Sequence, residues 1–159
     1  MLEQENLLIQ PDGAGWILVD PDSRRPLGRA RWRSPYIPLG LGWLARRALE
    51  VCEMEDEPLL FTVQRLWALL PKWEVCDADW NRIAVLRRNR IVDVFGQPWV
   101  VVERRMDSLH LCGENREFAC ARTATDGIQL EFASEVRGNP LAKMSLLAMV
   151  LVQGQQHTQ

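Results

Sequence analysis

The sequence of 159 residues is poor in lysine and histidine, with only Lys72, Lys143, His110 and His157. Its formal net charge of -2 excludes the strongly basic field that a dedicated nucleic-acid binder needs, so no nucleic-acid partner is predicted. The strongest apolar run, Leu141–Val152, is shorter than the about 20 residues that span a bilayer. The opening MLEQENLLIQ lacks the basic start and long apolar stretch of a signal peptide. We therefore expect a cytoplasmic protein.

The four cysteines, Cys52, Cys76, Cys112 and Cys120, include no C-x-x-C pair. With so few histidines, no zinc site of ordinary sequence spacing is visible. Free cysteine behaves as a small hydrophobic residue, and cytosolic thiols stay reduced. The sequence thus predicts four reduced, mostly buried thiols, no metal ligands and no cofactor.

Sequence motifs of catalysis are also missing, because the chain has no G-x-S-x-G and no glycine-rich phosphate loop. His110 lies near Cys112 and Glu114, but residues two apart on a strand share a face without forming a nucleophile, base and orienting group. Ser108 and His110 match no known motif. The prediction is a protein that is not an enzyme and has no catalytic residues. An enzyme that uses His110 as its base, in a pocket at the end of a β-barrel, is an alternative that ranks third, below two non-enzymatic functions.

The chain does contain one unit twice, WILVDPDSRRPLGRAR at 16–31 and WEVCDADWNRIAVLRR at 73–88. Each copy has a Trp, alternating apolar residues, an Asp-x-Asp pair and a returning apolar and basic run, which predicts a β-hairpin. The Asp pairs could ligate a hard cation, but no further acidic ligands follow at regular spacing. Turn formation is the favoured interpretation. Trp16 and Trp73 are predicted to be core residues.

Further short apolar runs, bounded by Gly, Pro, Asn or Asp, predict strands at 7–9, 49–54, 60–65, 91–94, 99–102, 116–122 and 127–132. Residues 34–46 are the least regular, and 42–48 could form one helical turn. Short strands separated by frequent turns are typical of an all-β barrel or sandwich.

The C-terminal region differs, because Asn139 and Pro140 form a favourable helix start and apolar residues then cover every side of the helix. A helix that is apolar all round is normally enclosed by protein. We therefore predict a mainly β fold, a closed antiparallel β-barrel of roughly 10–12 strands around a buried hydrophobic C-terminal α-helix at about 140–153. Residues 1–154 would form a single domain, and 155–159 a flexible polar tail.

The order of these segments resembles the tubby-like superfamily, which includes the phospholipid scramblases and the LURP-one-related proteins. The similar segments are GWILVDPDSRRPLGRA, LEVCEMEDEPLLFTVQR, WEVCDADWNRIAVLRR, RIVDVFGQPW and NPLAKMSLLAMVLV. The resemblance implies repeated hairpins around a central helix, and a lipid headgroup as a plausible ligand. Several features depart from the family pattern. Trp80 follows Asp79 where relatives often carry Gly, and the acidic calcium segment is missing. The proline-rich N-terminal region and clustered cysteines of many scramblases are also missing, and no segment matches the phosphoinositide-binding motif of tubby.

The densest basic cluster, Arg87, Arg88 and Arg90, is the candidate site for a lipid or another anion. The leading prediction is a non-enzymatic binding module that could associate with a membrane surface as a peripheral protein. Two alternatives stay open: the arginines are solvated strand ends, or the chain is a structural protein that binds a protein partner and no small ligand.

Overall fold

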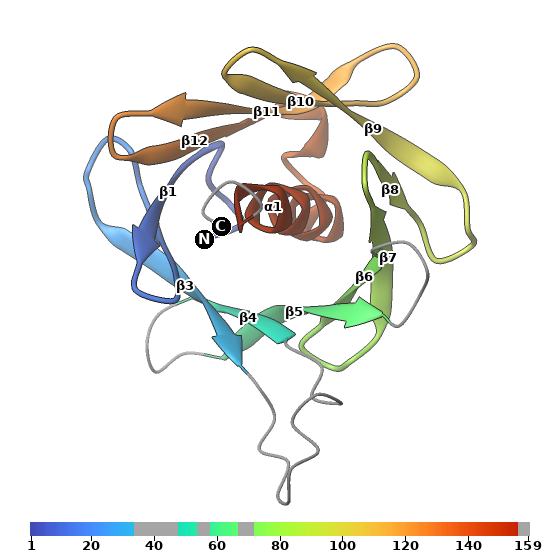
Figure 1. The fold of residues 1–159 in the computed structure, drawn as a ribbon, viewed down its shortest axis with the longest axis horizontal. Coiled ribbons are helices and arrows are strands. Elements are labelled where there is room, and N and C mark those ends of the chain that lie inside the picture. The colour runs from blue at the N-terminus through green and yellow to red at the C-terminus, as the bar shows by residue number, and fades with distance from the viewer. Residues whose placement is uncertain (34–47, 54–57, 67–71, 156–159) are drawn as a thin grey trace, which may run out of the picture.

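The computed structural model of this chain is mainly β, with a single long α-helix (Figure 1), and it describes residues 1–33, 48–53, 58–66 and 72–155. The strands are β1 (Asn6–Asp12), β2 (Gly15–Val19), β3 (Pro26–Arg33), β4 (Ala48–Cys52), β5 (Leu59–Leu66), β6 (Lys72–Asp77), β7 (Arg82–Arg87), β8 (Arg90–Val92), β9 (Pro98–Arg105), β10 (Ser108–Cys112), β11 (Glu117–Ala124) and β12 (Gly127–Phe132). A 3₁₀ turn, η2 (Ser134–Val136), leads to the helix α1 (Pro140–Gln155).

The twelve strands form one closed barrel in which each strand pairs antiparallel with its neighbours in sequence. The ring closes where β1 pairs with β12, with Leu7 opposite Leu130 and Ile9 opposite Ile128. Closure leaves no free sheet edge in the barrel. The predicted fold class, a closed antiparallel barrel with a C-terminal helix, is confirmed.

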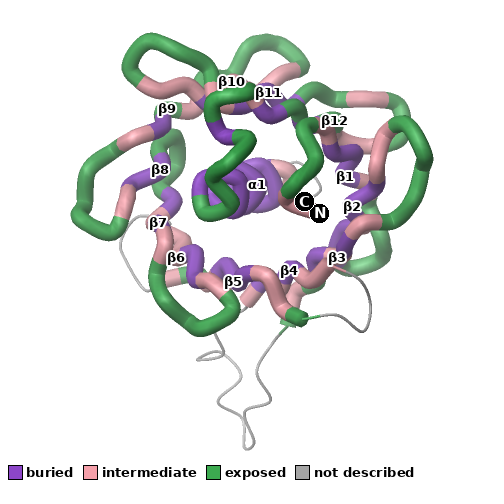
Figure 2. The backbone as a smooth tube through the Cα atoms, turned by 180° about the vertical axis from the view of Figure 1, so that it is seen from behind, coloured by how far each residue is buried: buried purple, intermediate pink, exposed green. Residues whose placement is uncertain are grey.

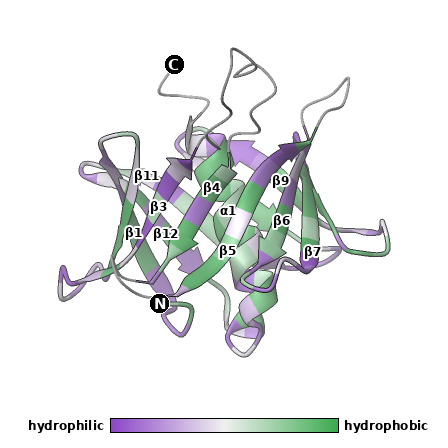
Figure 3. Cartoon of the chain, turned by 90° about the horizontal axis from the view of Figure 1, so that it is seen from below, coloured by the Kyte–Doolittle hydropathy of each residue, from purple (hydrophilic) through white to green (hydrophobic). Residues whose placement is uncertain are grey.

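The two ends of the barrel carry different sets of connections, because consecutive antiparallel strands turn at alternate ends. We call the end at which α1 begins the helix-entry end. Here lie the segment from β12 to α1 and the strand ends joined by the connections β2–β3, β4–β5, β6–β7, β8–β9 and β10–β11. The helix-exit end, where α1 ends, holds the turns β1–β2, β7–β8, β9–β10 and β11–β12. Figure 3 shows the barrel from the side, with α1 among the strands.

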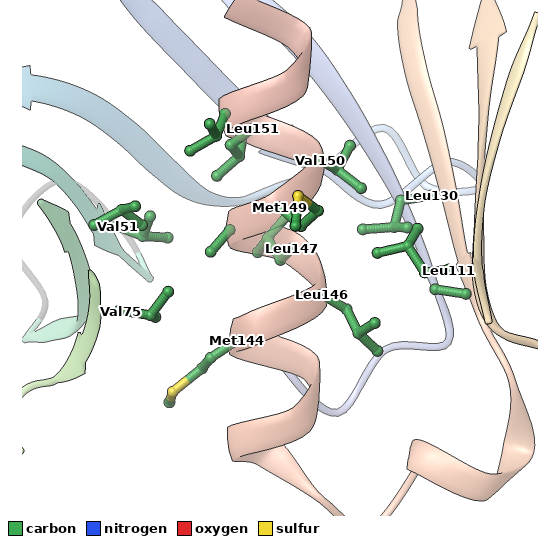
Figure 4. Packing of buried hydrophobic residues seen from close by; sticks show 14 of the residues in the cluster. Val51, Val75, Leu111, Leu130, Met144, Leu146, Leu147, Met149, Val150 and Leu151 are labelled. Carbon is green, nitrogen blue, oxygen red and sulfur yellow. The ribbon is translucent and has the colours of Figure 1, made fainter. Parts of the chain in front are cut away.

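The period-two alternation of the sequence corresponds to inward and outward faces of the strands. In β4, Leu49 and Val51 are fully buried while their neighbours are half-buried, and in β7 the buried residues are Ala84 and Leu86. The inward residues and α1 together form one hydrophobic core (Figure 4). Figure 2 shows buried residues along α1 and on the strands, and exposed residues mainly in the turns.

The helix begins as predicted, since Asn139 Oδ1 accepts a hydrogen bond of 3.0 Å from the Ala142 backbone N–H, and Pro140 opens the first turn. Every residue from Ala142 to Gln153 is buried. The apolar residues cover all sides of the helix because strands surround it on all sides. The prediction of an enclosed helix is therefore confirmed.

Polar side chains on α1 anchor it to the surrounding chain near both barrel ends. Lys143 is fully buried, and its Nζ donates hydrogen bonds of 2.8 Å to the carbonyl oxygens of Leu2 and Gln4. Burial lowers the pKa of Lys143 from its usual value, with a further contribution from the Arg137 charge. Near the exit end, Gln153 Nε2 donates a 2.7 Å hydrogen bond to the Arg88 carbonyl oxygen. These bonds fix the position of the helix along the barrel.

Two details differ from the sequence predictions. The strand β10 was not predicted, because its SLHLC pattern contains only two strongly apolar residues. The helix ends at Gln155 and not at 153, so Gly154 lies inside it; a Cβ at Gly154 would approach Ile128 Cδ1 to 3.2 Å. Of the predicted helical turn at 42–48, Ala48 is the first residue of β4, and residues 42–47 lie outside the described residues, as does the tail segment 156–159.

Replacing Leu147, which is fully buried in α1, tests this packing. Leu147→Ala is expected to lower the free energy of unfolding by about 2–5 kcal/mol, because it leaves a cavity between helix and barrel. Leu141→Ala is the matched control on the same helix, because Leu141 is 48% exposed and its truncation should change stability by about 0.5 kcal/mol or less. Urea unfolding measures both. Equal effects of the two substitutions would contradict an enclosed helix.

Candidate functional site

The candidate residues Arg87, Arg88 and Arg90 lie together in and beside the two-residue turn between β7 and β8. All three are exposed, and Arg87 pairs directly with Arg90 across the turn. Like charges at opposed positions of an antiparallel pair are destabilising. The hydrogen bond from Gln153 to the Arg88 carbonyl places this turn at the helix-exit end. The structure thus brings the three predicted arginines into one cluster.

The arginine cluster has no ion-pair partner among the residues that the structure describes. Other arginines do have partners: Arg33 Nε lies 2.7 Å from Glu50 Oε2, and Arg105 Nη2 lies 2.9 Å from Glu103 Oε2. Within the described part of the chain, no carboxylate pairs with these three guanidinium groups, which can therefore bind an external anion.

The β9–β10 hairpin lies beside the arginine turn, since Val102 N–H donates a 2.8 Å hydrogen bond to the Asn89 carbonyl oxygen. At the tip of this hairpin, four residues beyond Val102, Met106 is 97% exposed and has a φ of 40°. The helix-exit end thus carries exposed arginines and an exposed apolar tip on neighbouring hairpins.

A cleft of about 200 Å³ opens beneath this hairpin. Its lining includes Arg104, Met106, Ser108, Thr123 and Gly154. His110, which would be the base if the protein were an enzyme, does not line the cleft. Ser108, which does line it, forms a hydrogen bond to His110.

Charge differs between the barrel ends. Basic residues predominate near the helix-exit end: Arg33, Arg65, Lys72, Arg87, Arg88, Arg90, Arg104 and Arg105. Carboxylates predominate in the strand connections of the helix-entry end: Asp20, Asp22, Glu53, Asp77, Asp79, Asp93 and Glu114. The helix dipole places partial positive charge at the N-terminus of α1 and partial negative charge at its C-terminus. Both ends therefore complement the dipole.

The aspartates of the repeated unit form turns, as predicted. Asp77 Oδ1 accepts hydrogen bonds from the backbone N–H groups of Asp79 and Asn81, at 3.0 and 2.8 Å. Asp20 Oδ1 accepts one from Asp22 N–H at 2.9 Å, and this bond, followed by contributions from Ser23, lowers the pKa of the Asp20 carboxyl. These carboxylates thus cap backbone N–H groups.

The β8–β9 turn has the same hydrogen bonding as the β6–β7 turn. Asp93 Oδ1 accepts from Phe95 and Gln97 N–H, at 2.9 and 2.8 Å. Gly96, with a φ of 88°, occupies the position that Trp80 occupies with a φ of 65°. Trp80 therefore adopts the left-handed conformation that usually favours glycine, and it is 62% exposed.

The tryptophans of the two repeat copies meet through a third one. Trp32 lies between them, with ring centroids 6.5 Å from Trp16 and 5.6 Å from Trp73. Trp16 is buried as predicted, whereas Trp73 is only half-buried because it lies near the start of β6, at the barrel end.

All four cysteines are free thiols, as predicted. Cys76 and Cys120 are buried, and Cys52 and Cys112 are half-buried. Burial is the main cause that raises the pKa of Cys52, Cys76 and Cys112, so these thiols are protonated and poorly nucleophilic at neutral pH.

His110 belongs to a group of polar side chains on β10 and β11 that the sequence analysis did not assemble. Its Nδ1 is hydrogen-bonded to Glu117 Oε2, and its Nε2 lies 3.0 Å from Ser108 Oγ. The Cys120 thiol lies in the same group. Sequence spacing did not indicate this group, because its members come from two strands and one of them, Glu117, lies at a β-bulge.

Comparisons with protein-family models, curated proteins and solved structures give no significant match for this chain. Within the described residues, no helix has both the length and the apolar character needed to cross a membrane.

Exchanging Trp80 and Gly96 for one another tests the turn geometry. Trp80→Gly is expected to raise the free energy of unfolding by up to about 1 kcal/mol, because left-handed backbone costs a non-glycine residue about 1–2 kcal/mol and glycine adds about 0.4–1 kcal/mol of unfolded-chain entropy. Gly96→Trp should lower it by a similar amount, up to about 1 kcal/mol, because the same two contributions then have the opposite signs. Thermal unfolding measures both, and a destabilised Trp80→Gly variant would show that Trp80 packs favourably.

Proposed function

We propose that this protein is a non-enzymatic module of the tubby-like superfamily that binds anionic phospholipid headgroups through the helix-exit end of its barrel. The observation that carries the proposal is the arginine cluster: Arg87, Arg88 and Arg90 are exposed, have no ion-pair partner in the described residues, and include a like-charged cross-strand pair. Two arginines placed opposite each other lower the stability of the fold. Such destabilising arrangements are typical of functional sites.

The shape and composition of the arginine cluster favour a membrane surface over a small soluble anion. The three exposed arginines lie within four residues of one turn, so together they can meet more than one headgroup. Met106, exposed on the adjacent hairpin, provides an apolar group that can enter the headgroup region. Each Arg near an anionic leaflet contributes about 1 kcal/mol, so three give about 3 kcal/mol of peripheral, salt-sensitive binding at a cytoplasmic membrane face.

The architecture supports assignment to the tubby-like superfamily. A barrel of consecutive antiparallel strands with a helix buried along its bore agrees with what the sequence resemblance implies. Trp80 keeps the backbone conformation of the glycine that relatives often carry there. Calcium regulation is not part of the proposal, because the acidic calcium segment of the family is missing from this sequence.

Flotation with vesicles of phosphatidylcholine, with and without phosphatidylserine, tests the proposal. We expect the wild-type protein to bind the anionic vesicles at low salt and the R87A/R88A/R90A variant to bind about 100-fold more weakly, from the loss of about 3 kcal/mol. The control R24A/R82A/R137A removes the same charge from arginines paired with Asp126, Glu74 and Glu5.

The two variants separate a localised site from a general charge effect. An equal loss in both variants would mean that net charge, and not the arginine cluster, determines binding. No flotation of the wild-type protein would remove the lipid proposal. Inorganic phosphate added in excess should compete poorly, because a single soluble anion does not reproduce a multivalent surface.

A second candidate function is the binding of a protein partner at the helix-entry end. Two adjacent turns there carry exposed aromatic residues, Trp80 at 62% and Phe95 at 86% exposure, and Leu141 at the start of α1 is 48% exposed. Carboxylates of Asp77, Asp79 and Asp93 lie in the same turns. Aromatic groups within an acidic rim suit a basic protein surface. This candidate would gain support if wild-type protein fails to bind vesicles.

A further inference from the structure

The polar group around His110 lies on the outer face of the barrel, away from the arginine cluster. His110 and Cys120 are direct cross-strand partners on β10 and β11. Their neighbours Leu111 and Ala119 belong to the core, so side-chain alternation directs His110 and Cys120 outward. The His110 side chain is 15% exposed, and Cys120 is 3% exposed.

A β-bulge brings Glu117 to the same face. Glu117 and Cys120 are three residues apart, so on a regular strand their side chains would point to opposite faces. The register changes here, from Leu111 opposite Ala119 to Cys112 opposite Glu117, which leaves Phe118 as the extra residue. The bulge therefore turns Glu117 outward, toward the His110 ring.

The hydrogen bonds around His110 accommodate a tautomer in which Nε2 carries the proton. The Ser108 hydroxyl lies 2.9 Å from the Arg105 carbonyl oxygen and 3.0 Å from His110 Nε2, and it has one proton to donate. When that proton goes to the carbonyl oxygen, Ser108 Oγ accepts from His110 Nε2–H. In a neutral ring, Nδ1 then presents a lone pair to the Glu117 carboxylate. Two acceptors in contact require a proton or a cation between them.

We propose that His110 Nδ1, a Glu117 carboxylate oxygen and Cys120 Sγ bind a divalent zinc-like cation. The three donor atoms lie within 4.8 Å of one another. A tetrahedral Zn²⁺ with bonds of about 2.0–2.3 Å separates its ligands by roughly 3–4 Å, so small side-chain rotations complete the site. Mixed nitrogen, oxygen and sulfur donors suit Zn²⁺ better than Mg²⁺ or Ca²⁺.

The surroundings of these ligands match those of a metal site. A ligating histidine usually donates its second ring N–H to a nearby group, and Ser108 provides that acceptor. Glu103 lies opposite His110 on β9, but its carboxylate accepts a hydrogen bond from the Arg105 guanidinium, so we do not include it among the metal ligands. The Glu117 side chain is 43% exposed, so water can take the fourth position. The ion would link β10 to β11 at the bulge.

Titration with Co²⁺, a spectroscopic substitute for Zn²⁺, tests the site. We expect one Co²⁺ per chain, a thiolate-to-cobalt charge-transfer band in the near ultraviolet, and displacement of Co²⁺ by Zn²⁺. Cys120→Ser should abolish the band. Cys76→Ser is the matched control, because Cys76 is also buried and also lies at a bulge, between β6 and β7, and it should retain the band.

Two further variants keep the test decisive if Cys120→Ser fails to fold. Glu117→Gln, at an exposed position, should weaken Zn²⁺ binding and keep the charge-transfer band. Ser108→Ala should weaken Zn²⁺ binding about 10–100-fold, which is the usual effect of losing a group that orients a metal ligand. The absence of stoichiometric binding by the wild-type protein, or a band that persists in Cys120→Ser, would overturn the proposal and leave an imidazolium–carboxylate ion pair.

Discussion

Packing of an apolar helix against the inner face of a closed barrel is the interaction on which this structure depends. Strand residues such as Leu49, Val51 and Leu130 have no exposed surface, and they form one core with Leu146 and Leu147 of α1. Figure 4 shows Val51 and Leu130 on opposite sides of the helix. Neither part can bury its apolar surface without the other. Helix and strand side chains share one hydrophobic core inside the barrel, and the candidate sites described above lie at the barrel ends and on the outer face.

The helix also relates the barrel ends to one another. Lys143 bonds the chain start at one end, and Gln153 bonds the arginine turn at the other, so the fixed helix positions both. Its dipole is complemented by acidic turns at entry and by basic turns at exit. The proposed lipid surface therefore lies on a turn that the core holds in place. The proposed cation site on β10 and β11 is independent of that turn.

Much of the fold could be predicted from the sequence, because it follows from local patterns. Asp-containing turns, period-two strands and the all-apolar helix after Asn139 and Pro140 each have a local physical cause, and together they indicate a barrel. Long-range properties could not be predicted in this way. Pairing between His110 and Cys120 depends on strand register, and the outward turn of Glu117 depends on a bulge. The contact between the Arg87–Arg90 turn and β9 depends on how two hairpins lie side by side.

Native-state hydrogen exchange of the α1 backbone amides tests the enclosed helix most directly. The amides of Leu146–Val150 should exchange only through global unfolding, with a free energy equal to that from urea denaturation, because the helix cannot leave an intact ring of strands. The contradicting result is exchange of these amides at a clearly lower free energy, by about 2 kcal/mol or more, while strand amides stay protected. That result would mean that the helix opens to solvent without unfolding the barrel.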